Sequence, residues 1–325
     1  MLVAQTTQVA QPERYSLVHH LTTSPFHHLT TVLDAAALLA LGNLPLVARL
    51  IADGAQAGLH PSRRRGAGLE FSQYRPYQTG DDLRRLDWRL AARSDRYYLR
   101  ESDVDTRLTV RLVLDASASM NHADAAGVSK LAYARLLLAG LAHVAQQQGD
   151  SPGLYVLGPA GLRTTPPRAD AGQLPRLFHA LSTTTAAGLL PTDAATAGPL
   201  LSRQGNTLTV VVSDFYDLEP AGPLDRLLTQ LRAAGGDVLA LHLLAPNELT
   251  LDYPAAATLE DLETGQRLQL DPAQRPAYQQ QLQAWLRQTE QAIRGHGLDY
   301  YRLLTDEPPA GALRTVLRRR QGAAR

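Results

Sequence analysis

The chain has 325 residues, of which 44% are hydrophobic and 19% are charged. This composition can bury the core of one large domain with an appendage or of two ordinary domains, and it excludes a disordered chain. The formal net charge of +1 excludes a general attraction to nucleic acid or membrane, so a charged partner has to be recognised by a local patch. The absence of cysteine excludes disulfides, thiolate metal sites and a cysteine nucleophile.

The N-terminal part of the sequence has no pattern typical of a secretory signal or a membrane span. The first residues, MLVAQTTQVAQPERY, lack a basic stretch followed by an apolar one. The longest apolar candidate, LDAAALLALGNLPLVARLIADG, is interrupted by polar residues and by Pro45, so it is too short to cross a bilayer as an uninterrupted apolar helix. The sequence therefore predicts a cytoplasmic protein without a membrane span.

The pattern of residues 33–57 predicts two short helices divided by Gly-Asn-Leu-Pro at 42–45. After residue 106, strand-like apolar runs alternate with helical patterns. Strands that alternate with helices indicate right-handed crossovers, and hence a mostly parallel sheet covered on both faces. The predicted strands lie at 108–114, 153–157, 161–165, 207–213, 237–244 and 298–304. The predicted helices lie at 128–148, 171–182, 194–203, 222–234, 273–295 and 310–320.

These patterns divide the chain into four parts. An N-terminal polar and helical extension (1–60) precedes a segment rich in Arg, aromatic residues and Asp (61–106). The α/β domain (107–305) follows, with a hairpin near 259–271 that is expected to turn at Thr264-Gly265. A C-terminal helix and tail (306–325) end the chain. Within the first strand of the domain, Arg111 is expected to reach solvent at the strand's end.

The stretch DASASM directly follows the first predicted strand, at the place where parallel sheets bind their ligands. It offers the carboxylate of Asp115 and the hydroxyls of Ser117 and Ser119. Side chains two residues apart in an extended strand are separated by about 6.6 Å, whereas two oxygens on one Mg²⁺ lie about 3 Å apart. The chain therefore has to curl sharply here, which the two small alanines between these residues permit.

A second carboxylate strengthens this prediction. Asp214 ends the run TLTVVVSD, and the carboxyl ends of adjacent parallel strands face the same crevice, so Asp115 and Asp214 are expected to lie close together. Carboxylates with hydroxyls form a hard-oxygen set that suits Mg²⁺ or Mn²⁺. The alternative is that Asp115 and Ser117 only cap the following helix.

The arrangement resembles the metal-ion-dependent adhesion site of von Willebrand factor A domains. In those domains Asp-x-Ser-x-Ser follows the first strand, a Thr comes from a second loop, and an Asp follows the fourth strand. Asp115, Ser117 and Ser119 match the first element, and Asp214 matches the last. The resemblance implies Thr192, in LLPTDAATAGPLL, as the Thr. Three neighbouring residues compete with it, Thr183, Thr184 and Thr185.

The segment GAGLEFSQYRPYQTGDDLRRLDWRLAAR closely resembles a signature of the bacterial "domain of unknown function 58" family, in which it precedes an A domain. The similarity extends over most of residues 60–320. It implies an α/β fold with a doubly wound, mostly parallel, von Willebrand factor A-like sheet in residues 107–305. Many members carry N-terminal membrane helices, whereas this chain resembles a shorter, soluble branch. Members typically occur with MoxR-type AAA+ ATPases, which implies an adaptor or co-chaperone role.

The ligand set and the resemblance together predict a metal-dependent binding protein that is not an enzyme. A Mg²⁺ or Mn²⁺ ion with an open coordination position would accept an acidic side chain from a MoxR-type ATPase or a client protein. The enzyme alternative is a Mg²⁺-dependent hydrolase that uses Asp115 as nucleophile or Asp214 to orient water. Ser117 stands where such an enzyme is expected to have a second Asp, and common catalytic motifs are absent. Lys130, the only lysine, is attributed to compositional bias, and no lysine is expected near the carboxylates.

Residues 63–100 suggest a third alternative, nucleic-acid binding, because ten Arg and five acidic residues are interleaved with aromatic side chains. The aspartates are spaced among the arginines like ion-pair partners, which favours a structural motif or a protein-docking surface instead. The residues expected to form the specific part of such a surface are Tyr77, Asp81, Asp82, Arg84, Asp87 and Trp88.

Overall fold

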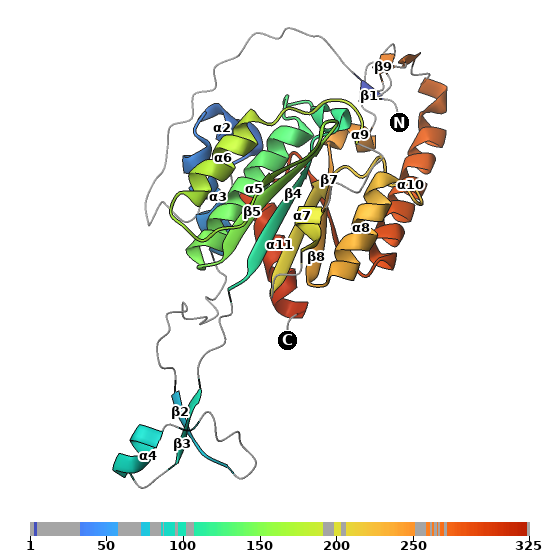
Figure 1. Ribbon diagram of the computed structural model, residues 1–325. Helices are drawn as coiled ribbons and strands as arrows, with labels where there is room; N and C mark the ends of the chain where they lie inside the picture. The colour runs from blue at the N-terminus through green and yellow to red at the C-terminus, as the bar shows by residue number, and fades with distance from the viewer. Residues whose placement is uncertain are drawn as a thin grey trace.

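The computed structural model describes most of the chain. The described residues are 3–4, 33–57, 73–78, 86, 88–94, 97–101, 107–190, 198–202, 206–250, 258–260, 262, 265, 267–269 and 272–323. They form a six-stranded sheet with helices on both faces, a two-stranded sheet with a helix, and a small three-stranded sheet (Figure 1).

The six-stranded sheet has the strand order β11-β8-β7-β4-β5-β6. All neighbouring strands are parallel except β6, which runs antiparallel to β5 at one edge. The prediction of a doubly wound, mostly parallel α/β sheet is confirmed. The strands are β4 (Thr109–Asp115), β5 (Ser151–Gly158), β6 (Gly161–Thr165), β7 (Thr207–Ser213), β8 (Asp237–Leu244) and β11 (Asp299–Leu304).

The sheet reverses its winding direction at β4, and this reversal positions the candidate site. From β4 the chain continues to β5 on one side, whereas the later strand β7 pairs with β4 on the other side. A crevice at the carboxyl ends of the strands is expected at such a switch point. Asp115 ends β4 and Asp214 follows β7, so both carboxylates lie at this crevice.

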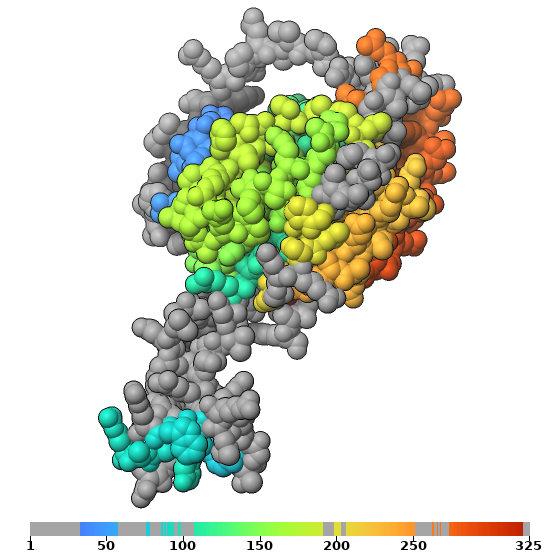
Figure 2. Space-filling model, in the orientation of Figure 1, coloured from blue at the N-terminus to red at the C-terminus, as the bar shows by residue number. Residues whose placement is uncertain are grey.

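Helices cover the two faces of the sheet because the central strands are apolar at consecutive positions. In β4, Leu112 and Leu114 belong to the core on one face, whereas Val113 belongs to the core on the other. The helices of the first face are α2 (Ala35–Ala40), α3 (Leu44–Gln56), α5 (Lys130–Gln147), α6 (Gln173–Thr183) and α11 (Pro309–Ala323). Those of the second face are α7 (Gly198–Leu201), α8 (Pro223–Ala234) and α10 (Arg275–Gly295). In the view of Figure 2, α6, the β5–β6 edge, α7 and α8 follow one another across the surface.

Helices α3 and α11 pack in the same hydrophobic cluster as α5. The contact between α3 and α5 is close at Gly140, where an added Cβ would lie 2.5 Å from Cγ2 of Ile51. From α11, Leu313 and Val316 are buried in this cluster. The domain boundaries at residues 60, 106 and 305 stay predictions, and residues on both sides of the α/β segment contribute to one core.

The expected position of Arg111 is wrong. The side chain is buried, and its guanidinium donates hydrogen bonds to the backbone carbonyls of Leu200 and Ser202. Side chains alternate between the faces of a strand, so Arg111 shares its face with Val113 and lies under α7. The backbone carbonyls at the end of α7 thus replace the water that was expected to hydrate the guanidinium of Arg111.

The smaller elements agree with the predicted hairpin and add others. Strand β9 (Thr258–Glu260) pairs antiparallel with β10 (Arg267–Gln269), and Gly265 between them has a φ of 69°, so the hairpin is confirmed. Strand β1 (Val3–Ala4) pairs with β9. The sequence did not predict the short elements η2 (Ala118–Asn121), α9 (Pro246–Thr250) and η4 (Pro272–Gln274).

Strands β2 (Gln73–Pro76) and β3 (Tyr98–Glu101) form an antiparallel two-stranded sheet, and helix α4 (Trp88–Ser94) lies in the connection between them. Among the helices of the described part of the chain, none combines the length and the apolar content needed to cross a membrane.

Candidate metal centre

The DASASM loop curls as the metal hypothesis requires. Asp115 is the last residue of β4, and its Oδ1 accepts a hydrogen bond of 2.8 Å from the backbone N–H of Ser117, which turns the chain into η2. The hydroxyl oxygens of Ser117 and Ser119 are then 3.0 Å apart. This separation matches the distance of about 3 Å between neighbouring ligands of one Mg²⁺.

A serine that sequence reasoning missed ties the two strand ends together. Ser213, the last residue of β7, donates from its Oγ to Oδ2 of Asp115 over 2.6 Å and accepts from the N–H of Phe215 over 2.8 Å. Phe215 has a φ of 53°, in the left-handed region, so the chain turns sharply after Asp214. Ser213 lies within the run TLTVVVSD, and nothing in that sequence distinguishes it from an ordinary strand residue.

The carboxyl group of Asp115 is buried, and no Lys, Arg or His side chain of the described residues forms an ion pair with it. Burial and then the charge of Asp214 raise the pKa of Asp115 to about 6, although hydrogen bonds from Ser213 and Ser117 act in the opposite direction. The hydrogen bonds from Ser213 and Ser117 therefore offset only part of the cost of keeping the Asp115 carboxylate ionised in the protein interior.

Lys130 lies beside the second carboxylate. Its Nζ is 2.7 Å from Oδ2 of Asp214 and 2.9 Å from Oε1 of Glu248, and it lies 4.5 Å from the centre of the Tyr216 ring. Burial alone would lower the pKa of the lysine amine, but the charges of Asp214 and Glu248 together outweigh burial and raise it. The ammonium is fully enclosed by protein, with a side-chain exposure of 0%.

This position corrects two sequence-based interpretations. Lys130 was attributed to composition, and no lysine was expected near the carboxylates, yet Lys130 pairs with Asp214. The reason is that Ser129 caps α5, which places Lys130 at the first position of that helix, facing the end of β7. A usable signal was present, because the only lysine of an Arg-rich chain lies at the start of an apolar helix.

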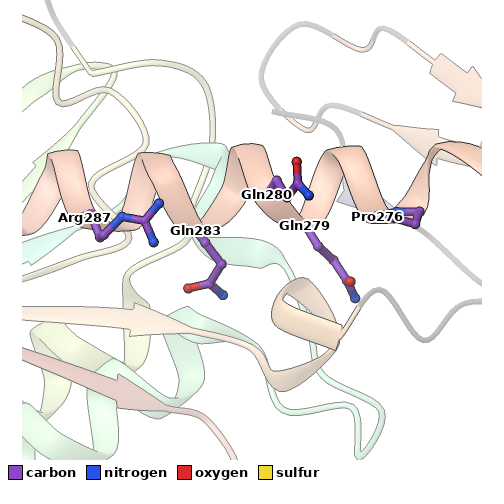
Figure 3. Close-up of a pocket in the computed structure, with 5 residues that line it drawn as sticks. All are labelled: Pro276, Gln279, Gln280, Gln283 and Arg287. Carbon is purple, nitrogen blue, oxygen red and sulfur yellow. The ribbon is translucent and has the colours of Figure 1, made fainter.

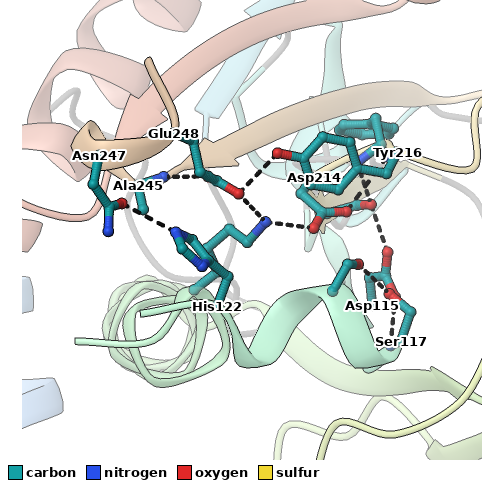
Figure 4. A network of polar contacts seen from close by, with 12 residues as sticks. Asp115, Ser117, His122, Asp214, Tyr216, Ala245, Asn247 and Glu248 are labelled. Atoms are coloured by element: carbon teal, nitrogen blue, oxygen red, sulfur yellow. Dashed lines mark hydrogen bonds and ion pairs between the residues drawn. The ribbon is translucent and has the colours of Figure 1, made fainter. Parts of the chain in front are cut away.

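Glu248, which the sequence analysis also missed, completes the buried polar network (Figure 4). Its Oε1 accepts from the Tyr216 hydroxyl over 2.8 Å, and its Oε2 accepts from the N–H of Ala245 over 2.7 Å. Burial alone would raise the pKa of Glu248, but the charges of Lys130 and His122 and the Ala245 N–H together lower it. This glutamate is therefore an anchored anion that shares the ammonium with Asp214.

The hydroxyls of two of the competing threonines are engaged by backbone carbonyls of α6. The Thr183 hydroxyl donates to the carbonyl of His179 over 2.9 Å, and the Thr184 hydroxyl donates to the carbonyl of Ala180 over 2.7 Å. Both side chains thus complete the last turn of α6. Thr185 is exposed, and Thr192 lies outside the described residues.

The segment that leads from α6 toward residue 192 lies against the DASASM loop. The N–H of Ala118 donates to the carbonyl of Gly188 over 2.8 Å, and the N–H of Ala187 donates to the carbonyl of Ala116 over 3.0 Å. This contact agrees with the expectation that a second loop approaches the site, and the role of Thr192 stays a prediction.

The chemistry of the donors fits a hard divalent cation. Two hydroxyl oxygens at ligand spacing lie next to Asp115, whose strand end adjoins that of Asp214. Three buried carboxylates and one ammonium leave two uncompensated negative charges, counting Asp115, Asp214, Glu248 and Lys130. Within the described residues no group of three His, Cys, Asp or Glu side chains forms a metal cluster, so such a site would depend on the hydroxyls.

The helix-cap alternative explains less of this geometry. Ser117 is the N-cap of η2 but makes no capping hydrogen bond with its side chain, and α5 is capped by Ser129. Asp115 does bond the N–H of Ser117, while its other oxygen binds Ser213 on a different strand.

The predicted partner surface is described only in part. Tyr77 is half-buried and packs edge to face against Tyr97 with ring centres 6.4 Å apart, and Trp88 on α4 is 62% exposed. The β2–β3 strand pair and α4 lie apart from the DASASM loop (Figure 1). The remaining residues of this prediction lie outside the described residues, namely Asp81, Asp82, Arg84 and Asp87.

An open hollow of about 370 Å³ runs along one side of α10 (Figure 3). Its lining carries amides and a guanidinium but no carboxylate, and it is separate from the residues of the candidate metal centre. The lining residues are Pro276, Gln279, Gln280, Gln283 and Arg287.

Several solved structures are similar to this chain. It is similar to the conserved hypothetical protein BatB from Bacteroides thetaiotaomicron, with 17% identity, a TM-score of 0.44, and coverage of 66% of this chain and 99% of that one. It is also similar to the SpRpn10 VWA domain, with 11% identity, a TM-score of 0.35, and coverage of 64% and 93%. At these values the likeness gives no information about function.

The chain is also similar in sequence to known proteins. The uncharacterized proteins Rv1480 of Mycobacterium tuberculosis and Mb1516 of Mycobacterium bovis are each 30% identical to it over 298 residues, which cover 89% of this chain and 92% of theirs. The family model described as "Protein of unknown function DUF58" matches residues 73–290. With a family match over more than half of its length and relatives that align along most of it, the chain belongs to the DUF58 family.

Proposed function

We propose that this protein is a metal-dependent protein-binding adaptor. A Mg²⁺ ion, or Mn²⁺, would be held by Asp115, Ser117, Ser119, Thr192 and Asp214 and would bind an acidic side chain of a partner protein. The observation that supports this proposal most directly is the buried Asp115 carboxylate, which has no ion-pair partner among the described residues and is followed by two hydroxyls 3.0 Å apart.

The charge of the cluster supports a divalent ion. Buried charges that are not paired are costly, and this cluster has two more negative than positive charges. One divalent cation at Asp115 would neutralise the cluster. When bound, the ion would supply an electrophilic centre with an open coordination position that favours a carboxylate oxygen.

The resemblance of the DASASM loop and Asp214 to an adhesion site supports a protein-interaction role, and the family resemblance suggests the partner. We infer that the acidic side chain belongs to a MoxR-type AAA+ ATPase or to its client, and that the complex works in the cytoplasm. The β2–β3 strand pair and α4 offer a second contact through Tyr77, which follows β2, and Trp88 on α4. Asp81, Asp82, Arg84 and Asp87 would act with them.

The hydrolase alternative is less well supported. Lys130 is the lysine that a phosphate-transferring site would need, but it is fully buried and already shared by Asp214 and Glu248. Both carboxylate oxygens of Asp115 accept hydrogen bonds, which does not favour a nucleophile. Nothing in the described part of residues 63–100 favours nucleic acid over protein as the partner.

The proposal is tested by recovery of the ATPase on the immobilised 325-residue chain, with Mg²⁺ or with EDTA. We expect the wild type to retain a MoxR-type ATPase from the same organism only with Mg²⁺, and Asp115→Ala to retain none in either buffer. The matched control is Asp170→Ala, which removes an exposed carboxylate just before the start of α6 and should behave as the wild type. Equal recovery by wild type and Asp115→Ala in both buffers would refute the proposed function.

A further inference from the structure

The buried ion pairs are arranged in a row that leads to the candidate metal centre. The Lys130 ammonium contacts both Glu248 and Asp214. In Figure 4, Asp214 lies between Glu248 on one side and Asp115 with Ser117 on the other. The ammonium contacts Oδ2 of Asp214 at 2.7 Å. Among the described residues, Oδ1 of the same carboxylate accepts one hydrogen bond, a long one of 3.4 Å from the N–H of Tyr216. One oxygen of Asp214 is thus held by an internal cation, and the other is weakly engaged.

The Lys130 side chain is held in place by its surroundings. It is buried, its ammonium contacts two carboxylates, and Nζ lies 4.5 Å from the centre of the Tyr216 ring. Glu248 is itself anchored by Tyr216 and by the N–H of Ala245. The ammonium therefore cannot turn to solvent without leaving buried carboxylates unpaired, a costly arrangement.

We propose that Lys130 is an internal cation that competes with the divalent ion for Asp214, and that Glu248 sets the strength of this competition by sharing the ammonium. Lys130 would then limit the affinity of the centre for Mg²⁺, so that the ion binds reversibly and remains electrophilic. This inference rests on the proposed metal site and assigns to Lys130 and Glu248 a positioning role there.

The physical reason is the charge of the cluster. With the ammonium present, one divalent ion neutralises the three carboxylates, whereas without it one negative charge would remain after the ion binds. An extra negative charge next to a buried site strengthens the binding of a cation there, because the effective dielectric constant of the protein interior is low. Removal of a carboxylate has the opposite effect.

The test is Mg²⁺ titration, by calorimetry, of the EDTA-treated full chain and three variants. Lys130→Met should bind Mg²⁺ at least tenfold more tightly than the wild type, and Glu248→Gln at least tenfold more weakly. The double variant Lys130→Met/Glu248→Gln has the same net charge as the wild type, and its affinity should return to within a few-fold of the wild-type value. A merely structural role predicts weaker binding in all three variants.

The chain offers a second readout, because Lys130 is its only lysine. Protein grown with ¹⁵N- and ¹³C-labelled lysine has a single lysine Nζ signal in an NMR spectrum, and that signal reports on the ammonium itself. We expect Mg²⁺ to shift this signal in the wild type, and EDTA to reverse the shift. Glu248→Gln should need more Mg²⁺ for the same shift.

The outcomes separate this inference from the proposed function. If the wild type binds no Mg²⁺ by either readout, the metal site itself is refuted. If the wild type binds Mg²⁺ but the affinities of the variants do not move in opposite directions, the metal site stands and the role of Lys130 is refuted. If Lys130→Met does not fold, the sign test uses Glu248→Gln against the wild type and against the double variant, which must bind more tightly than Glu248→Gln.

Discussion

At the scale of single residues, the buried polar groups around the end of β7 are held by one another. Ser213 bonds Asp115, Lys130 joins Asp214 to Glu248, and Tyr216 bonds Glu248. Each partner satisfies a group that would otherwise be buried unpaired, so removal of one member costs more than the loss of its own hydrogen bond. The network therefore fixes the side chains next to the candidate metal centre.

His242 gives a pH prediction at this scale. Burial is the largest cause that lowers the pKa of this histidine, which falls to about 3, and Lys130 adds to the effect. The histidine is protonated in the unfolded chain below a pH of about 6.5 but stays neutral in the fold. Its contribution to stability is complete above pH 6.5 and is lost as the pH falls from there toward 3, by about 1.4 kcal/mol per pH unit.

The test compares the free energy of unfolding at pH 7.5 and pH 5.5 in EDTA. We expect the wild type to lose about 1 kcal/mol more stability between these values than His242→Gln, which has no imidazole to protonate. His179→Gln, at an exposed position of α6, should retain the wild-type dependence. An unchanged pH dependence in His242→Gln would contradict the prediction.

At the scale of elements, the close packing of α3 on α5 gives a second prediction. Gly140→Ala would place a Cβ 2.5 Å from Cγ2 of Ile51, so the two helices would have to separate. Overpacking of this kind costs about 1–3 kcal/mol. Gly295→Ala, at the end of α10, has no atom within 4 Å of the added Cβ and is the matched control.

The measurement is urea unfolding followed by circular dichroism. Gly140→Ala should unfold at a lower urea concentration than the wild type, and Gly295→Ala at the same or a slightly higher one, because Ala favours a helix over Gly. Equal midpoints for the two variants would show that α3 yields without cost.

At the scale of the whole molecule, the core depends on helices outside the α/β segment. Helix α11 buries Leu313 and Val316 against α3 and α5, and the Tyr133 hydroxyl donates to the backbone carbonyl of Glu307 over 2.8 Å. A chain that ends at residue 305 would expose this apolar face of α5 to water.

We expect the chain ending at residue 305 to be recovered mainly in the insoluble fraction or to lack a cooperative thermal transition. The chain ending at residue 323 retains α11 and should melt as the full chain does. A cooperative transition for residues 1–305 near that of the full chain would show instead that the C-terminal helix is an independent appendage.

The sequence by itself determined the order and type of the main elements. The apolar runs TLTVVVS and DVLALHLL form strands at the predicted residues, because a strand buried on both faces must be apolar throughout. The position of Asp115 and Asp214 after neighbouring strands followed from the same pattern. Thr192 and most of the predicted partner surface lie outside the described residues and stay predictions.

Only the tertiary structure decided which groups meet these carboxylates. Lys130 and Glu248 are 118 residues apart in sequence, and they meet because α5 and α9 both begin at the carboxyl end of the sheet. Arg111 is buried in the same way by a helix that comes much later in the chain. Periodicity reports which side of an element is apolar, whereas a buried polar side chain is paired by whichever element covers it, and that depends on how the sheet is wound.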